Sequence, residues 1–253
     1  MKEVWIVLLT VYSMTIVIQT KELTKKYPDA LALDSLNISI NEGDIYGLLG
    51  PNGAGKTTAI HMMLGLLSPT SGEVRVLGHD PIREGNILSS KINFSSAFVN
   101  LPSNLKISEN LKIFSKLYGV KDYEKKVDEL LNQFEIIHLK NRLVGALSSG
   151  EKTRLNLCKA LLNDPAVLLL DEPTASLDPD VAEKVRRILK NIQKQRKLSI
   201  VYTSHNMNEV EALCDRVAFI HHGKKVAEGT PSEVKADHGA VTLEEVFIKL
   251  VRK

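Results

Sequence analysis

The segment GLLGPNGAGKTT, residues 47–58, constrains the fold more than any other part of the chain. With the preceding DIY it forms an apolar stretch that ends at Gly50, followed by a glycine-rich loop and a helical pattern that begins near Lys56. A strand, a loop and a helix in this order form the repeating unit of proteins with parallel sheets. The sequence therefore predicts an α/β fold built on a largely parallel sheet.

The glycine-rich loop also predicts a ligand. Glycines allow successive backbone N–H groups to turn toward one centre and approach a phosphate closely. Residues 50–57 match G-x-x-x-x-G-K-[ST], so Lys56 is expected to reach the terminal phosphates and Thr57 to bind Mg²⁺. A glycine-rich turn without a ligand is the alternative, and the flanking strand and helix disfavour it. The expected nucleotide-binding residues are Gly50, Pro51, Asn52, Gly53, Ala54, Gly55, Lys56, Thr57 and Thr58.

A second segment, AVLLLDEP, leads from five apolar residues to two adjacent carboxylates, Asp171 and Glu172. The apolar run predicts a fully buried strand. Because neighbouring positions on a strand point to opposite sides, we expect the two acids to do different work. Asp171 is expected to hold Mg²⁺, and Glu172 to orient or deprotonate a water that attacks the γ-phosphate. An acidic turn before Pro173 would be preferred only in a chain without a phosphate loop.

The rest of the chain alternates between strand and helix patterns. Further strands are predicted at residues 16–19, 37–40, 73–77, 199–203 and 217–221, and helices at 181–195, 207–213 and 242–253. Between about residues 92 and 150 the pattern changes to helices without strands, at 108–117 and 123–134. We interpret this region as a helical lobe inserted between two halves of the nucleotide domain.

The N-terminus begins with an almost unbroken apolar run, residues 4–18. As a helix it would span about 23 Å at 1.5 Å per residue, less than the ~30 Å hydrocarbon layer. A signal peptide would need a more basic start and a small-residue cleavage site. We therefore expect residues 1–13 to be an N-terminal extension, Met14 to be a candidate start, and residues 14–253 to form the nucleotide-binding domain.

Composition narrows the choice of partners and compartment. The 33 basic and 30 acidic residues leave a net charge of +3, too little to indicate nucleic acid or an anionic membrane as the main partner. Cys158 and Cys214 lack metal-like spacing and are expected to be small buried hydrophobes in a reducing compartment, the cytoplasm.

Residues 147–151, LSSGE, lie at the start of a helical pattern and predict a second anion site, because a helix N-terminus carries free N–H groups and about half a positive charge. This segment occurs together with the phosphate loop, LLLDEP, SLDP at residues 176–179, and TSH ending at His205. In order and spacing these motifs resemble the ATP-binding cassette (ABC) family. The resemblance covers the chain from about residue 16 to the C-terminus.

The resemblance implies a P-loop NTPase core with an antiparallel N-terminal β portion and an inserted helical lobe. It implies that the loop residues above bind ATP, with Mg²⁺. It also implies a dimer of cassettes, identical or different, in which the signature segment of one copy contacts the ATP held by the other. The signature residues are Leu147, Ser148, Ser149, Gly150 and Glu151.

Three more positions match family motifs one at a time. Tyr27 matches the aromatic residue that stacks on adenine, although it could equally be a surface tyrosine beside Pro28. Asp178 matches the loop that links the two active sites, with helix capping as its alternative role. His205 matches the histidine that contacts the γ-phosphate, which places it with Glu172 as a catalytic residue.

Two positions depart from the family pattern. An alignment without gaps places Ala97 where the family has a glutamine that helps to hold Mg²⁺ and water and relays the nucleotide state to the membrane partner. Ser95, Ser96 and Asn100 are candidates to substitute for it through water. Glu151 replaces the usual glutamine of the signature and brings a negative charge near a phosphate site, unless its side chain points outward.

These observations favour the ATP-hydrolysing subunit of a transporter, acting on separate transmembrane permease subunits at the cytoplasmic face of the membrane. The C-terminal TLEEVFIKL resembles the drug and polysaccharide exporters. The main alternative is a soluble cassette ATPase of translation or DNA repair, and a regulatory module that does not hydrolyse ATP is a third. A GTPase or small-molecule kinase would leave the signature unexplained, and no nucleic acid is expected.

Overall fold

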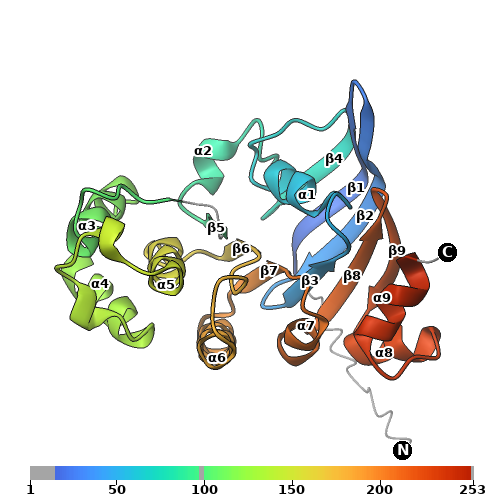
Figure 1. The fold of residues 1–253 in the computed structure, drawn as a ribbon. Coiled ribbons are helices and arrows are strands. Elements are labelled where there is room, and N and C mark those ends of the chain that lie inside the picture. Colours follow the sequence, from blue (N-terminus) through green and yellow to red (C-terminus); the bar gives the residue numbers. More distant parts are fainter. Residues whose placement is uncertain (1–14, 97–99, 252–253) are drawn as a thin grey trace, which may run out of the picture.

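The computed structural model describes residues 15–96 and 100–251, which form two sheets with helices packed around them (Figure 1). The smaller sheet is antiparallel, with strand order β2-β1-β4. Its strands are β1 (Ile16–Tyr27), β2 (Ala30–Asn41) and β4 (Ser71–Val76). The antiparallel N-terminal portion is therefore confirmed, with the first two strands longer than the sequence pattern indicated.

The larger sheet has the strand order β5-β6-β7-β3-β8-β9. All neighbours are parallel except the last pair, so the prediction of a largely parallel sheet is confirmed. The carboxyl ends of β6, β7 and β3 lie at one edge, which brings Asp171, Thr203 and the start of the phosphate loop together. The strands are β3 (Ile45–Leu49), β5 (Ile92–Ser96), β6 (Val167–Asp171), β7 (Ser199–Thr203), β8 (Arg216–His221) and β9 (Lys224–Gly229).

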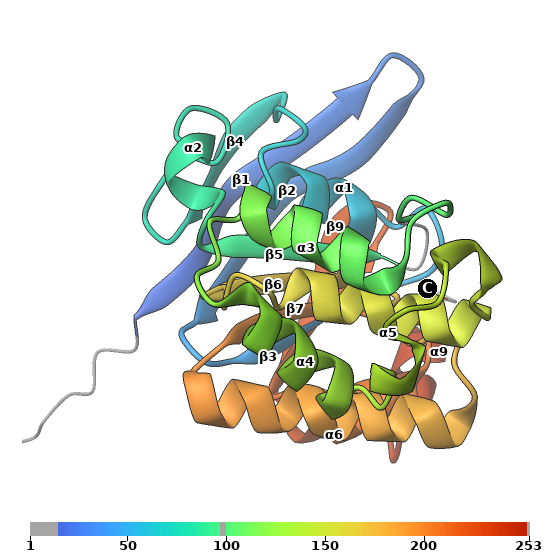
Figure 2. The same ribbon diagram turned by 90° about the vertical axis from the view of Figure 1, so that its left-hand side faces the viewer.

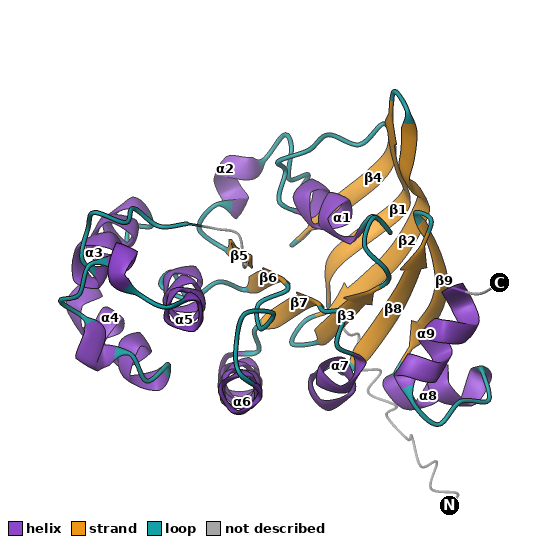
Figure 3. Ribbon diagram, viewed as in Figure 1, coloured by secondary structure: helices purple, strands orange, loops and turns teal. Residues whose placement is uncertain are grey.

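Helices cover both faces of this sheet, and α3, α4 and α5 gather at one end (Figures 2 and 3). Two 3-10 turns, Ile137–Leu139 and Val144–Ala146, connect α4 to α5. The helices are α1 (Lys56–Met63), α2 (Gly85–Leu88), α3 (Ile107–Leu117), α4 (Tyr123–Gln133), α5 (Ser149–Ala160), α6 (Pro179–Arg196), α7 (Met207–Leu213), α8 (Pro231–Asp237) and α9 (Leu243–Val251).

The apolar runs of the central strands follow from burial on both faces. In β6, Val167 and Leu169 pack with α1 and the antiparallel sheet, while Leu168 and Leu170 pack with the helices of the opposite layer. All four side chains are inaccessible to solvent. A strand buried on both sides reads as a continuous hydrophobic run instead of an alternating one, which is why AVLLL is recognisable in the sequence.

One prediction is wrong at its boundary. Residues 92–150 were expected to hold helices without strands, yet residues 92–96 form β5, which pairs in parallel with β6 in a register that places Ser96 opposite Asp171. The sequence INFSS is short and half polar, as an edge strand can be, so its apolar pattern is weak. Strand β9 and helix α8 were also not predicted. The helices at residues 108–117 and 123–134 are confirmed within one residue.

The cysteines and the N-terminus complete the comparison with the sequence. Cys158 and Cys214 are free and buried, and burial raises the pKa of both thiols, in agreement with their predicted role as small hydrophobes. Residues 1–13, which we treat as an extension, lie outside the described residues. Within the described part of the chain, no helix is long and apolar enough to span a bilayer.

Candidate active site

The phosphate loop joins β3 to α1 with a backbone that requires glycine. Gly50, Gly53 and Gly55 have φ values of 149°, 77° and 109°. A Cβ on Gly55 would lie 2.4 Å from the Ala32 carbonyl oxygen, and one on Gly50 would lie 2.2 Å from that of Ile220. Gly55 is the N-cap of α1, and no side chain caps this helix end. The first N–H groups of α1 are therefore not satisfied by a capping side chain.

Lys56 is the first residue of α1, and its side chain lies within the loop. It is 7% exposed, and its Nζ donates to the carbonyl oxygens of Gly50 at 2.8 Å and Pro51 at 3.1 Å. Burial lowers the pKa of the Lys56 ammonium, and the nearby carboxylates of Glu172 and Asp171 oppose that shift. A cation is thus held beside two acids at the base of the loop.

Asp171 is fixed by two hydroxyl groups. Thr57 Oγ1 donates to its Oδ2 at 3.0 Å, and Thr203 Oγ1 donates to its Oδ1 at 2.6 Å. The same Thr203 hydroxyl accepts a hydrogen bond from the Glu172 backbone N–H at 3.0 Å. Both carboxylate oxygens of Asp171 are therefore oriented, and the ends of β6 and β7 are tied together.

Glu172 leaves the strand with a φ of 53°, a backbone conformation that residues other than glycine rarely adopt. This turn corrects the expectation that the two acids point to opposite sides, because Asp171 and Glu172 line the same cavity. Glu172 Oε2 accepts a hydrogen bond from His205 Nδ1 at 2.5 Å. A carboxylate only accepts, so Nδ1 carries a proton, and Nε2 is free to act as an acceptor in the neutral ring.

A cavity of about 480 Å³ collects these groups. Its lining residues come from the phosphate loop and α1, the end of β6, the segment after it, and the end of β7: Ala32, Asn52, Gly53, Ala54, Gly55, Lys56, Thr57, Thr58, Asp171, Glu172, Ala175 and His205. The lining does not include Tyr27, Gly50 or Pro51, nor any residue of the signature 147–151.

The signature residues form the start of α5. Ser148 is the N-cap and its Oγ accepts from the Glu151 N–H at 3.2 Å, while Glu151 Oε2 accepts from the Ser148 N–H at 2.7 Å. This reciprocal capping box directs the Glu151 carboxylate back onto the helix end, and it lowers the pKa of Glu151. Leu147 is buried in the core, whereas Ser149 is exposed.

Comparisons with known proteins agree with this geometry. The family model described as ABC transporter matches residues 33–175, more than half of the chain. The chain belongs to the ABC transporter family. It is an ATP-binding cassette with ATPase function.

Two curated relatives and one solved structure are informative about this cassette. The bacitracin transport ATP-binding protein BcrA of Bacillus licheniformis is 40% identical over 85% of this chain and 70% of its own length. The probable multidrug ABC transporter ATP-binding protein YbhF of Escherichia coli K12 is 36% identical over 93% of this chain, which spans only 42% of YbhF. The cassette MJ0796, solved as a post-hydrolysis dimer with ADP and Pi, is 27% identical with a TM-score of 0.76, over 84% of this chain and 98% of that one. The two relatives favour a transporter subunit over an ATPase of translation or DNA repair.

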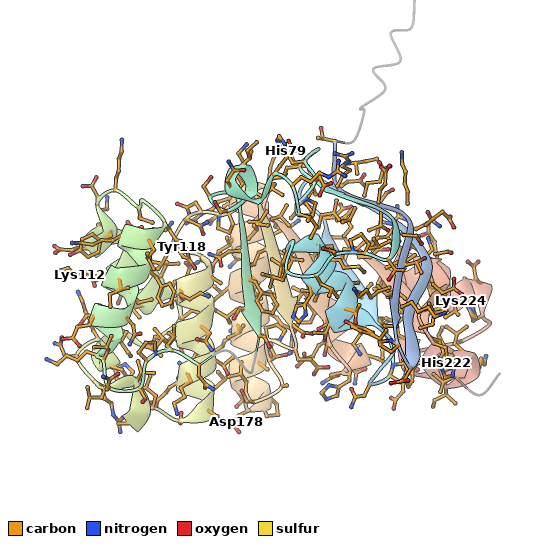
Figure 4. All side chains as sticks on the ribbon, turned by 90° about the horizontal axis from the view of Figure 1, so that it is seen from above. His79, Lys112, Tyr118, Asp178, His222 and Lys224 are labelled. Carbon is orange, nitrogen blue, oxygen red and sulfur yellow. The ribbon has the colours of Figure 1, made fainter. Side chains whose placement is uncertain are left out.

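Tyr27 and Asp178 do not line the cavity. Tyr27 ends β1, is 41% exposed, and has Lys25 Nζ 5.3 Å from its ring centre. Asp178 is at the N-cap position of α6 but makes no capping hydrogen bond with its side chain, and it lies at the outer edge of the molecule (Figure 4). Ala97 lies outside the described residues. Ser95 and Ser96, named as its substitutes, are buried at the end of β5.

Sequence reasoning missed Thr203, which orients Asp171 and receives the Glu172 N–H. The available signal was its place in TSH, at the end of a buried strand and two residues before His205. Ala32 and Ala175 also line the cavity, and small side chains of this kind leave no chemical signature in a sequence.

Proposed function

We propose that this cassette is the ATP-hydrolysing subunit of an exporter and acts on separate permease subunits at the cytoplasmic face of the membrane. The names of BcrA and YbhF, which refer to bacitracin and multidrug transport, support a transport role, and a further relative named for Nod factor export supports the export direction. The observation that carries the catalytic part is the hydrogen-bonded pair of Glu172 and His205 at the edge of the phosphate-loop cavity.

In this proposal Glu172 is the general base. It takes a proton from water as the water oxygen forms a bond to the γ-phosphorus; the bond from that phosphorus to the bridging oxygen breaks, and ADP leaves with the electron pair. His205 Nδ1 holds one carboxylate oxygen of Glu172, which leaves the other oxygen to receive the proton. Lys56 and the first N–H groups of α1 bind the phosphates, and Tyr27 stacks on adenine.

The oxygen atoms around Asp171 fit a magnesium ion. Mg²⁺ prefers oxygen ligands and usually takes only one or two from the protein. The Thr57 hydroxyl and the Asp171 carboxylate supply two such oxygens 3.0 Å apart, held by the Thr203 hydrogen bond. When bound, Mg²⁺ would neutralise charge that develops on the phosphates.

We further propose that the cassettes work in pairs, with the signature of one copy on the ATP of the other. Support comes from the position of the signature, which does not line the cavity of its own chain and leaves Ser149 exposed. The structure of MJ0796 is itself that of a dimer. Asp178, at the edge of the molecule, is proposed to lie in the loop that links the two sites.

The test uses Glu172→Gln, which keeps the side-chain size but removes the general base. Hydrolysis should fall by roughly 10² to 10⁴, while ATP binding remains. ATP with Mg²⁺ should then convert the variant into a stable dimer, as measured by light scattering. Adding Ser149→Arg should restore the monomer without loss of nucleotide binding. A variant saturated with ATP that stays monomeric, alone and with its permease subunits, would contradict the paired arrangement.

A further inference from the structure

A chain of hydroxyl groups connects the signature helix to the segment that follows Glu172. Thr153, on the second turn of α5, is 6% exposed. Its Oγ1 donates to the Ser149 carbonyl oxygen at 3.0 Å and lies 2.8 Å from Ser176 Oγ. Ser149 is the exposed signature serine, and Ser176 belongs to the 172–178 segment between β6 and α6. α5 and α6 lie side by side in both Figure 1 and Figure 2.

The hydrogen bonds that link these three residues can be donated in only one direction. The Thr153 hydroxyl has a single hydrogen, and a carbonyl oxygen can only accept, so that hydrogen points to Ser149. The bond between Thr153 and Ser176 must therefore be donated by the Ser176 hydroxyl. Within helices, a threonine hydroxyl often donates to the carbonyl oxygen four residues earlier. This local preference does not explain the hydrogen bond between Thr153 and Ser176.

Packing supports the same connection. A Cβ built on Gly150 would lie 3.4 Å from Leu177 Cδ2 and 3.8 Å from the Ser176 carbonyl oxygen, so the 172–178 segment rests against the start of α5. The near end of this segment is anchored separately, since Thr174 Oγ1 donates to the buried Glu209 carboxylate at 2.6 Å. One end of the segment is thus fixed to α7 and the other to the signature helix.

We propose that Thr153 and Ser176 are positioning residues that hold the signature helix in register with the catalytic segment of the same chain. This inference rests on the proposed paired function, in which Glu172 serves the chain's own ATP and Ser149 serves the partner's. Through these two hydroxyls, a change at one ATP site would move the signature groups that contact the other ATP. The two hydroxyls touch neither ATP nor water themselves, and they act through the orientation of α5.

Three variants separate this role from simple stability. Thr153→Val keeps the shape of the side chain and removes both hydrogen bonds, Ser176→Ala removes only the bond between the two segments, and Thr153→Ser keeps the hydroxyl as a matched control. We expect Thr153→Val and Ser176→Ala each to lower turnover about three- to tenfold, the range for loss of one hydrogen bond. The Hill coefficient for ATP should fall toward about 1. The melting temperature should fall by no more than about 1–6 °C per lost hydrogen bond. The ATP affinity of the monomer should not change, and Thr153→Ser should behave as wild type.

The double variant gives the deciding result. Because both substitutions break one connection, Thr153→Val with Ser176→Ala should lose no more activity than Thr153→Val alone. Full additivity, or wild-type turnover and cooperativity in Ser176→Ala, would overturn the inference. Ser176 is exposed, so its variant remains informative if Thr153→Val fails to fold. The dimer of Glu172→Gln is the reference. If it forms while Ser176→Ala remains fully cooperative, only this inference fails. If it forms neither alone nor with the permease subunits, the paired function fails.

Discussion

The cassette has two helix N-termini that the sequence marks for phosphate, at α1 and α5, and they are built in opposite ways. At α1 the N-cap is Gly55 in a left-handed conformation, and no side chain caps the helix. At α5 the N-cap is Ser148, which exchanges two hydrogen bonds with Glu151. The first end has backbone donors that no capping side chain satisfies, while the second satisfies part of its donors within the chain.

This difference in capping indicates that the two helix ends bind phosphate in different ways. The loop before α1 combines a buried lysine with glycines at positive φ, a conformation that glycine adopts readily. The start of α5 is capped by its own side chains and carries a carboxylate, so a phosphate must compete with the negative charge of Glu151. We infer that α1 binds ATP in each chain by itself, whereas α5 adds a weaker contact that depends on the partner.

The largest expected effect is at α1. Lys56→Ala removes the buried ammonium beside Glu172 and Asp171, so the phosphate charge loses its counter-charge and hydrolysis should become undetectable, with weaker ATP binding. Measured ATPase activity and ATP affinity check this. Lys112→Ala is the matched control, because Lys112 is exposed on α3 at the far end of the lobe (Figure 4). Equal activity of wild type and Lys56→Ala would refute the nucleotide assignment.

The next effect concerns replacement of the positive-φ glycines of the phosphate loop. Gly55→Ala combines a φ of 109° with a Cβ 2.4 Å from a backbone oxygen, so it should cost more than the about 1–3 kcal/mol of backbone strain alone. For a chain of this size, each 1 kcal/mol lowers the melting temperature by about 2–4 °C. Gly53→Ala has a similar strain at φ 77° but no atom within 4 Å of its Cβ, and should be milder. Thermal unfolding that ranks the two variants the other way would contradict this loop geometry.

The sequence predicted α1 better than the rest of the site because its requirements are local. Glycines that need positive φ and a lysine and threonine on the next turn all fall within one short segment. The fully buried strands β3 and β6 were equally recognisable, since burial on both faces leaves an unbroken apolar run.

Features that depend on distant segments were harder to predict. The edge strand β5 pairs with only one neighbour and carries polar residues, so a helical lobe was predicted over it. Glu172 has a positive φ, and its backbone N–H donates to the side-chain hydroxyl of Thr203 from β7, a residue 31 positions later. The contact of Thr153 with Ser176 joins positions 23 residues apart, and neither residue type is distinctive.

At α5 a glycine substitution should have the reverse outcome. Gly150 has no positive φ, and its added Cβ would meet only Leu177 Cδ2 at 3.4 Å and the Ser176 carbonyl oxygen at 3.8 Å. Gly150→Ala should therefore fold at least as stably as wild type, since alanine is favoured over glycine in helices by up to about 1 kcal/mol. The extra methyl group would press on Leu177 of the 172–178 segment, and the shift this imposes on the start of α5 should weaken the ATP-dependent dimer about tenfold, or ~1.4 kcal/mol. Sedimentation with ATP in the Glu172→Gln background measures this, and a large loss of melting temperature would contradict it.

The smallest effect is expected for Glu151→Gln. This substitution should lower the stability of the fold but strengthen the ATP-dependent dimer. The backbone hydrogen bond from Ser148 lowers the pKa of Glu151 below its ordinary 4.5. Its capping contribution is therefore complete above that pH and lost as the pH falls through the lowered value. At pH 7 the amide still accepts from Ser148 but lacks the charge that a helix N-terminus favours, so the melting temperature should drop by about 1–3 °C.

The same substitution should tighten the ATP-dependent dimer, because the partner's phosphates no longer meet a carboxylate at the start of α5. High salt should reduce the difference in dimer affinity between Glu151→Gln and wild type, as it screens the repulsion between exposed charges. Glu244→Gln, an exposed change in the first turn of α9, controls for the loss of one charge. Lower stability together with a tighter dimer would show that the carboxylate stabilises α5 at the expense of phosphate contact. A weaker dimer would instead mean that Glu151 itself helps to receive the partner, and that the two helix ends differ less than their caps indicate.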